Sequence, residues 1–393
     1  MAHTAIGKIN KPVAINVLHV RSTIGMYGAE KVLLNLMGEF KKSIYNTKLS
    51  VSVSIIEGIS EQSQNLALLL KKQGLPHESI VSKKRLDLSA VKQLYSTMKH
   101  KKISVIHTHD YKSLLFMILA TLFSNKKIIH HIHGALGNTK AERIYAFIER
   151  ICMVRANQII TVSKNQKDII AGYPYLKNKV IQVNNGTVLP SNAVQNDTKE
   201  NHTQKNSEPF TLVMVARFTP EKNHKLALDV LNELKIHKTN KPVQLILLGD
   251  GPNNQAIKNQ MDEYGLQESI KLVGFTNDVQ SWLKKADLLL ITSTTEGMPM
   301  CLLEAMALGL PTVSTPVGEI SHLLTQSQSG LLASKKEALA QLIITLMEND
   351  SLYQEYSRNA QAYSEEHLSV QKQAQELSGI YQRLMNKSGS INT

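Results

Sequence analysis

The sequence predicts an α/β protein that consists of two doubly wound parallel sheets. Its 393 residues are too many for one ordinary core and suit two domains. Short apolar strand patterns alternate with helix patterns along nearly the whole chain, which is typical of a parallel sheet wrapped by helices. A polar segment at 189–208 interrupts this alternation and is expected to link the two domains.

The first domain is expected over 1–188. A strand at 13–20 leads into a loop at 21–28, and a helix with apolar residues at helical spacing follows at 29–37. Further strand patterns cover 49–56, 105–107, 128–134, 158–163 and 180–183, and helix patterns cover 65–73, 88–99 and 141–155. The turn Asn184-Asn185-Gly186 closes this domain.

The second domain is expected over 209–368 and repeats the same alternation. Its strand patterns cover 211–215, 243–248, 270–273 and 286–292, and its helix patterns cover 223–236, 253–264, 278–285, 337–348 and 352–366. The remaining segment, 369–393, is expected to hold a last helix at about 370–386 and a tail.

Composition excludes several classes of protein. A hydrophobic content of 42% is that of a globular chain, and the longest apolar run, 114–123, is about half of what a bilayer-spanning helix needs. Residues 1–20 lack the layout of a signal peptide. Cys152 and Cys301 are far apart, which fits a reducing compartment and argues against a disulfide framework or a zinc site. We therefore expect a cytoplasmic protein.

The net charge of +13 is unevenly distributed. Residues 1–205 hold 29 Lys or Arg and 12 Asp or Glu, whereas residues 206–393 hold 16 and 20. The excess of positive charge therefore lies entirely in the first half. Such asymmetry points to an anionic partner, for which membrane phospholipid, a phosphorylated acceptor and nucleic acid are the candidates. A solvated basic face without any partner would show the same composition.

The stretch 294–311 describes a turn and a helix that follow a buried strand. Pro299 suits the first turn of a helix, and Gly309 with Pro311 is a usual stop, so a helix is expected at about 299–308. Glu296 then precedes the helix and Glu304 lies on it. The first amides of such a helix suit a phosphate group, although an ordinary strand-turn-helix unit would show the same features.

Glu296 and Glu304 are separated by seven residues and followed by Ala-Met-Ala-x-Gly-x-Pro. This pattern resembles the Glu-seven-Glu signature of retaining glycosyltransferases of family 4 (group 1), which have the GT-B fold. Similar motifs flank it, namely Val215-Ala216-Arg217-Phe218 with Lys222, Leu248-Gly249-Asp250-Gly251-Pro252, Gly274-Phe275, Pro316-Val317-Gly318 and, far upstream, Gly25-Met26-Tyr27-Gly28-Ala29-Glu30. The resemblance covers nearly the whole chain and is strongest over 210–335.

The resemblance implies a fold, an activity and a set of site residues. The fold would be GT-B, with two Rossmann-like domains that face each other across a cleft, and the last helix would cross back to the first domain. The activity would be retaining transfer of a sugar from a nucleotide diphosphate. Arg217 and Lys222 would contact the diphosphate, Glu304 the ribose, Glu296 a hydroxyl of the sugar, and His133 the donor sugar. The remaining donor-binding residues would be Gly28, Gly274, Gly297, Leu302 and Leu303.

The expected chemistry uses no metal and no cofactor. The departing diphosphate must be neutralised, and many glycosyltransferases use a divalent metal on an Asp-x-Asp motif for this purpose. The chain has no Asp-x-Asp, and Arg217 and Lys222 can brace phosphate oxygens instead. Histidines 130, 131 and 133 do not form a metal-binding helix motif.

Three other functions compete with a transferase. A sugar-nucleotide epimerase would share the GT-B fold but would not need the Glu-seven-Glu helix. A non-catalytic nucleotide-sugar-binding protein would have lost Arg217, Lys222 or His133, and all three are present. A nucleic-acid binder should show aromatic or Arg-rich clusters, whereas the cations here are mostly scattered lysines.

The expected partners are a UDP- or GDP-sugar donor, a glycan or lipid-linked acceptor and an anionic membrane surface, with no nucleic acid. Basic clusters at Lys83-Lys84-Arg85, Lys99-His100-Lys101-Lys102 and Lys126-Lys127 would favour a peripheral position on the inner face of the cytoplasmic membrane. The apolar segment 114–123 is either a companion of these clusters or part of the core. The pathway would be the synthesis of cell-surface polysaccharide such as lipopolysaccharide, capsule or exopolysaccharide.

Overall fold

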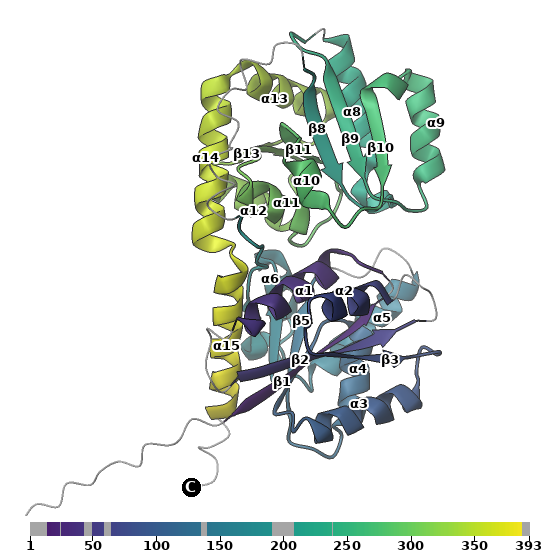
Figure 1. The fold of residues 1–393 in the computed structure, drawn as a ribbon, viewed down its shortest axis with the longest axis vertical. Coiled ribbons are helices and arrows are strands. Elements are labelled where there is room, and N and C mark those ends of the chain that lie inside the picture. The colour runs from purple at the N-terminus through teal and green to yellow at the C-terminus, as the bar shows by residue number, and fades with distance from the viewer. Residues whose placement is uncertain are drawn as a thin grey trace, which may run out of the picture. The chain divides into compact units, whose positions relative to one another are not determined.

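The computed structural model describes residues 14–23, 25–42, 49–58, 64–134, 140–190, 208–237 and 239–386. Its helices and strands form two parallel sheets with helices packed around them (Figure 1). The seven-stranded sheet has the order β3-β2-β1-β4-β5-β6-β7, and the six-stranded sheet has the order β10-β9-β8-β11-β12-β13. The predicted fold class of two doubly wound parallel sheets is therefore confirmed.

The first sheet is formed by seven strands joined by helices. Its strands are β1 (Ile15–Thr23), β2 (Leu49–Glu57), β3 (His77–Val81), β4 (Val105–Thr108), β5 (Lys127–Ile132), β6 (Gln158–Thr161) and β7 (Val180–Gln182). The helices of this half are α1 (Gly28–Lys41), α2 (Asn65–Lys72), α3 (Leu88–His100), α4 (Tyr111–Ala120), α5 (Lys140–Met153) and α6 (Lys164–Ala171), with a short 3₁₀ turn at Lys177–Lys179.

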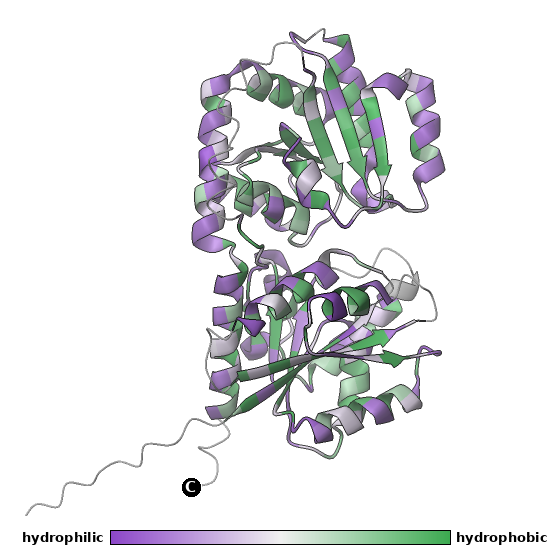
Figure 2. Cartoon of the chain, viewed as in Figure 1, coloured by the Kyte–Doolittle hydropathy of each residue, from purple (hydrophilic) through white to green (hydrophobic). Residues whose placement is uncertain are grey.

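The second sheet consists of β8 (Phe210–Val215), β9 (Val243–Leu248), β10 (Ile270–Gly274), β11 (Leu288–Ile291), β12 (Thr312–Ser314) and β13 (Gly330–Leu332). Its helices are α8 (His224–Ile236), α9 (Asn254–Tyr264), α10 (Val279–Leu283), α11 (Met300–Ala307), α12 (Gly318–Ser327), α13 (Lys336–Glu348) and α14 (Asp350–His367), and α15 (Val370–Asn386) is the last helix. Figure 2 shows that hydrophobic residues dominate the strands of this sheet, as expected for strands covered on both faces.

The structure differs from the expected elements in two places that matter for the site. β1 runs on to Thr23, so Arg21 lies in a strand and not in the loop predicted at 21–28. β3 was not predicted, because its sequence His-Glu-Ser-Ile-Val has one buried residue, Ile80, and shows no apolar run. β3 stands at the edge of the sheet, where a polar strand is tolerated.

Contacts divide the chain into two compact units. The first holds residues up to Ile132, Leu136–Ile160 and the chain from Ala374 on, and the second holds His133–Ala135 and Thr161–Gln373. Within the first unit, the hydroxyl of Tyr381 in α15 lies 2.9 Å from Nδ1 of His107 in β4. The predicted boundaries at 188 and 209 stay predictions, and most of the predicted linker, 191–207, lies outside the described residues, as does the tail 387–393.

Each sheet has one position where the strand order reverses direction. In the first sheet this position lies between β1 and β4, and in the second it lies between β8 and β11. Loops that leave the carboxyl ends of the two strands at such a position diverge to opposite faces of the sheet and leave a crevice, where open α/β sheets bind ligands. The loops after β8 and β11 are those that carry Lys222 and Glu296.

Candidate donor-binding site

The loop after β8 presents two basic side chains and is firmly anchored. A 3₁₀ turn at Pro220–Lys222 ends at Asn223, whose φ of 51° is left-handed. The Thr292 hydroxyl, at the end of β11, lies 3.2 Å from the Lys222 carbonyl oxygen and 3.0 Å from that of Asn223. The amide of Thr294 donates to the carbonyl of Glu221 at 2.8 Å. The loops after β8 and β11 therefore hold each other in place.

Lys222 and Glu296 form the closest ion pair of this region. The Lys222 ammonium lies 2.6 Å from Oε1 of Glu296, and the hydroxyl of Ser293 donates to the same oxygen at 2.7 Å. The two charged side chains are 20% and 10% exposed, so water screens the pair less than it screens a surface pair. The structure thus brings together two predicted site residues that are 74 positions apart in the sequence.

Arg217 lies on the same loop and faces solvent more than Lys222 does. Its side chain is 45% exposed, and its NH2 group lies 3.5 Å from Oε1 of Glu221. Burial opposes the charge of Glu221, but hydrogen bonds from Thr219 and backbone groups, together with the charges of Arg217 and Lys222, lower the pKa of this carboxyl overall. Glu221 therefore stays ionised and pairs with the guanidinium of Arg217.

Helix α11 begins after Pro299, which is its N-cap residue. The predicted helix at 299–308 is thus confirmed to within one residue at each end. Glu304 is half-buried on it, whereas the side chains of Leu302 and Leu303 are fully buried. The amide of Leu302 donates to the carbonyl of Pro299 at 3.2 Å. Binding of phosphate by the amides of Leu302 and Leu303 stays a prediction.

Several charged residues of this region act on the thiol of Cys301. Its pKa is raised to about 12, chiefly by burial and also by the charges of Glu296 and Glu304, while Lys222 lowers it. Glu304 lies three residues after Cys301 on α11, and Glu296, which precedes the helix, pairs with Lys222. The thiol itself stays protonated at neutral pH, so it is not a nucleophile.

Two glycines let the backbone pack closely around Glu296. A Cβ on Gly318, whose φ is +53°, would lie 1.9 Å from the carbonyl oxygen of Glu296. The amide of Glu319, the next residue, donates to the carbonyl of Gly297 at 3.0 Å. A Cβ on Gly297 would lie 3.0 Å from the carbonyl oxygen of His133. Gly318 is therefore required by a close backbone contact with the loop that carries Glu296, and Gly297 leaves little room for a larger residue.

A second set of glycines joins the loops after β8, β9 and β10. A Cβ on Gly249, with φ +141°, would lie 1.9 Å from the carbonyl oxygen of Ala216, and one on Gly251 would lie 2.6 Å from that of Phe218. The amide of Gly249 donates to the carbonyl of Gly274 at 2.9 Å. Gly274 and Arg217 are thus neighbours of the same Gly-Asp-Gly turn, and they belong to one continuous set of loops.

Two segments of the chain match known families. Residues 195–363 match the family described as Glycosyl transferases group 1, and residues 28–189 match Glycosyltransferase Family 4. Together the two matches cover most of the sequence, in the order in which the two sheets occur. This chain belongs to glycosyltransferase family 4. The resemblance of its motifs to this family is thereby confirmed, and the protein is a glycosyltransferase.

Solved structures of other proteins share its GT-B fold. Anabaena HepE in complex with UDP-glucose has a TM-score of 0.76 and 19% identity, and covers 93% of this chain and 99% of its own. The lipopolysaccharide outer core galactosyltransferase WaaB has a TM-score of 0.70 and 18% identity, and covers 94% of this chain and all of its own.

Curated relatives are glycosyltransferases as well. The Escherichia coli UDP-Gal:alpha-D-GlcNAc-diphosphoundecaprenol alpha-1,3-galactosyltransferase is 26% identical over 256 residues, which are 63% of this chain and 66% of that protein. The putative colanic acid biosynthesis glycosyltransferase WcaL of Salmonella typhimurium is 32% identical over 140 residues, or 34% of each chain.

The remaining predicted residues, His133 and Gly28, lie in different units of this glycosyltransferase. His133 follows β5, and its carbonyl approaches Gly297 within the second unit. Gly28 is the first residue of α1 in the first unit. Burial of Arg21 opposes its charge, but Glu30, at 2.8 Å, and Asp110, at 3.9 Å, raise its pKa overall. Arg21 therefore fixes the loop that precedes Gly28.

Sequence reasoning missed several residues of this glycosyltransferase that hold the site in place. Thr292, Ser293 and Glu221 contact the predicted site residues, but each is an ordinary polar residue after a strand. Glu319 was also missed. Its carboxylate accepts from the amide of Lys164 at 3.0 Å and from the Gln182 side chain at 3.2 Å, all within the second unit. In the sequence, only their position next to motif residues could have indicated that they support the site.

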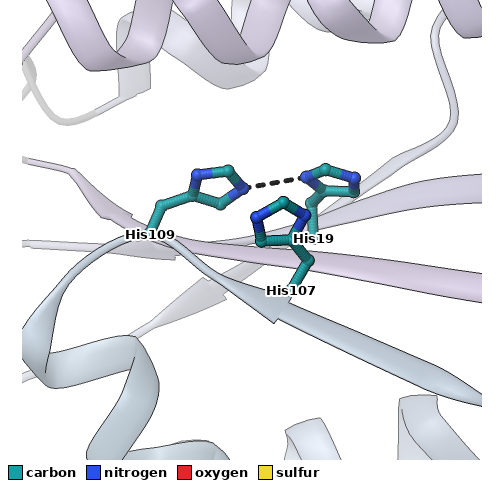
Figure 3. Close-up of side chains that lie close together, drawn as sticks. All are labelled: His19, His107 and His109. Atoms are coloured by element: carbon teal, nitrogen blue, oxygen red, sulfur yellow. Dashed lines mark hydrogen bonds between the residues drawn. The ribbon is translucent and has the colours of Figure 1, made fainter. Parts of the chain in front are cut away.

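His19, His107 and His109 of the first unit lie close together (Figure 3). His19 Nδ1 lies 2.8 Å from His109 Nε2, and the Tyr381 hydroxyl lies 3.2 Å from His19 Nε2. Burial lowers the pKa of His19 to about 3, so its ring is neutral. His19, His107 and His109 could reach one metal ion. The hydrogen bonds explain this arrangement without one, and the expected absence of a metal stays a prediction.

Proposed function

We propose that this glycosyltransferase moves a sugar from a nucleotide diphosphate donor to a lipid-linked or glycan acceptor, with retention of configuration, in the synthesis of a cell-surface polysaccharide. The observation that carries the proposal is the Lys222–Glu296 pair at 2.6 Å, with Arg217 on the same loop. Cations are needed where the diphosphate leaves, and a carboxylate is needed where the sugar hydroxyls are held.

The two cations suit a leaving diphosphate without a metal. The ammonium of Lys222 has three donors, so it can keep its contact with Glu296 and still donate to a phosphate oxygen. The guanidinium of Arg217 is 45% exposed and can rotate to form paired hydrogen bonds with phosphate. Glu304 would accept from the ribose hydroxyls. We propose that these groups replace the metal that an Asp-x-Asp motif would hold, and that no cofactor takes part.

The proposed reaction is a front-side displacement at the anomeric carbon. The bond from that carbon to the diphosphate oxygen breaks as the acceptor oxygen bonds to the same face of the carbon. The acceptor proton passes to the leaving phosphate oxygen. Lys222 and Arg217 stabilise the negative charge that develops on this phosphate, Glu296 holds a sugar hydroxyl, and His133 lies at the donor sugar. Activity that persists in EDTA would agree with this scheme, and activity that requires added Mg²⁺ or Mn²⁺ would contradict it.

The acceptor and the location are inferred from charge and from relatives. A diphosphate-linked lipid is part of the printed name of the Escherichia coli relative, and colanic acid, amylovoran and Vi polysaccharide occur in the names of others. Among the described residues, no helix is both long and apolar enough to cross a bilayer. We propose that the basic first half attaches the enzyme to the cytoplasmic face of an anionic membrane, where such an acceptor would be found.

Donor binding is tested by thermal unfolding of the purified protein with UDP, GDP, ADP and their sugars. One nucleoside diphosphate should raise the melting temperature by several degrees at saturating concentration, because a ligand that binds only the folded state stabilises it. The sugar nucleotide with the same base should do likewise. If none of them shifts the melting temperature, the proposed donor site is wrong.

A further inference from the structure

Helix α5 exposes a stripe of large apolar side chains. Ile144, Phe147 and Ile151 on the helix, and Val154 just after it, are each 50–59% exposed. Their spacing of three and four residues places them on one side of the helix. Glu149, which lies between them in sequence, is instead buried against His130 at 3.0 Å. The exposed face of α5 is therefore apolar from Ile144 to Val154.

Basic side chains surround this apolar stripe. Arg143 and Arg155, at its two ends, are exposed. Tyr145 on α5 stacks on Tyr111 of α4, with 4.6 Å between ring centroids, and the Arg85 guanidinium lies 5.9 Å from the Tyr145 ring. Arg85, the last residue of the cluster Lys83-Lys84-Arg85, thus lies beside Tyr145, which follows Ile144 in the sequence. This combination of an apolar stripe with flanking Arg and Lys is that of a helix in a membrane interface.

The neighbouring helices of the same unit repeat the combination. A surface groove of about 670 Å³ between α3 and α4 is lined by Leu88, Leu122 and Phe123 and by Lys99, Lys102 and Lys126. Leu88 is 70% exposed and Phe123 is 99% exposed. The segment 114–123 thus divides between the two alternatives left open by the sequence, because Leu114 and Met117 are core residues whereas Phe123 is exposed.

The positive charge of this region favours some binding partners over others. Residues 83–155 contain 14 Lys or Arg and four Asp or Glu, so a second copy of the same face would be repelled. Nucleic acid would satisfy the charge but would leave the aliphatic stripe exposed to water. A bilayer that contains anionic lipid satisfies both, because it offers apolar chains beneath negatively charged headgroups.

We propose that α5 lies in the plane of an anionic membrane, with Ile144, Phe147, Ile151 and Val154 inserted below the headgroups and the flanking basic residues at the phosphates. The 14 residues of α5 span about 21 Å, which is too short to cross a hydrocarbon core of roughly 30 Å. This inference rests on the proposed function, since it names the surface by which the transferase reaches a lipid-linked acceptor.

Vesicle co-sedimentation of the full-length protein tests the apolar contribution. The double variant Ile144→Gln with Ile151→Gln should bind vesicles of phosphatidylcholine and phosphatidylglycerol at least ~10-fold more weakly, because two apolar groups no longer enter the lipid. The matched control is Leu68→Gln with Ile236→Gln, since these residues are 60% and 64% exposed but lie on α2 and α8. The control should bind as the wild type does, and binding should fall as salt rises.

Tryptophan fluorescence tests the depth of α5 directly. The chain has one tryptophan, Trp282, so Phe147→Trp in a Trp282→Phe background reports on α5 alone. Its emission should shift to shorter wavelength with anionic vesicles and should be quenched by lipids brominated on the acyl chains. Ile236→Trp in the same background should show neither change.

Several outcomes would overturn the inference. Wild-type protein that does not bind anionic vesicles would do so, as would an α5 variant that binds like the wild type. A dimer in light scattering that the α5 variant dissociates, without a change in vesicle binding, would assign the stripe to a second copy. The thermal shift with nucleoside diphosphates is measured on the same proteins. If it persists while vesicle binding fails, the membrane inference alone is wrong; if it is absent, the proposed function fails independently.

Discussion

Lys222 and Glu296 already neutralise each other before any donor is bound. Their contact at 2.6 Å, reinforced by Ser293, keeps the ammonium in one position. A preorganised charge stabilises a transition state better than one that must first be oriented. The sequence predicted both residues by resemblance, but it could not show that they touch, because their contact depends on two loops from strands that are not consecutive.

At the residue scale, Lys222→Ala and Arg217→Ala should each lower turnover by at least ~100-fold, because each removes a charge from the leaving diphosphate. Lys225→Ala is the matched control, since Lys225 is three residues away, its side chain is 70% exposed, and it pairs with Asp229. Steady-state kinetics with the stabilising sugar nucleotide measure all three. Equal turnover in Lys222→Ala and Lys225→Ala would remove Lys222 from the proposed site.

The loops after β8 and β11 and the start of α12 contact one another and hold one another in place. Alternating apolar patterns predicted β8, β9 and α8 closely, since these elements are covered on both faces or are strongly amphipathic. The patterns could not predict the close contact of Gly318 with the loop of Glu296. A single glycine in a sequence does not indicate which backbone atom packs against it. The same limit applies to the length of β1, where polar residues continue the strand to Thr23.

Replacement of Gly318 by Ala is expected to disturb the loop that carries Glu296. The substitution adds a Cβ that would meet the Glu296 carbonyl at 1.9 Å, in a left-handed backbone conformation. We expect displacement of Glu296, with turnover lowered up to ~100-fold and stability lowered by more than ~1 kcal/mol. Gly38→Ala in α1 is the control, since a Cβ there meets nothing within 4 Å, and the helix should gain about 0.5–1 kcal/mol. Similar kinetics and melting temperatures for the two variants would contradict this account.

At the scale of the whole molecule, the two halves differ in charge and in how they bury histidine. Composition predicted the basic first half, and the fold shows that α3, α4 and α5 carry much of that charge beside exposed apolar residues. The buried histidines of the first unit could not be predicted from spacing, because β1, β4 and β5 bring them together from distant positions. Burial lowers the pKa of His19 and of His131 to about 3.

This burial predicts how stability depends on pH. Below pH 6.5 the unfolded chain takes up protons at these two histidines, whereas the folded protein does not do so until about pH 3. The stabilising contribution is therefore complete above pH 6.5 and is lost as the pH falls. Each histidine should cost about 2 kcal/mol at pH 5. Unfolding by urea at pH 7.5 and 5.0 measures the loss. His131→Gln should reduce it and the exposed His100→Gln should not, and equal pH dependence in both variants would refute the assignment.

We propose that the enzyme transfers a sugar from the nucleotide bound at Lys222 and Glu296 to a lipid-linked acceptor. The most direct measurement incubates the protein with a radiolabelled form of the stabilising sugar nucleotide and with lipid-diphosphate-linked glycans in vesicles, and then separates the lipid and aqueous fractions. We predict label in the lipid fraction for the wild type and for Lys225→Ala, and at least ~100-fold less of it for Lys222→Ala. Label that stays in the aqueous fraction as an epimer of the sugar nucleotide, or as the unchanged donor, would contradict the account.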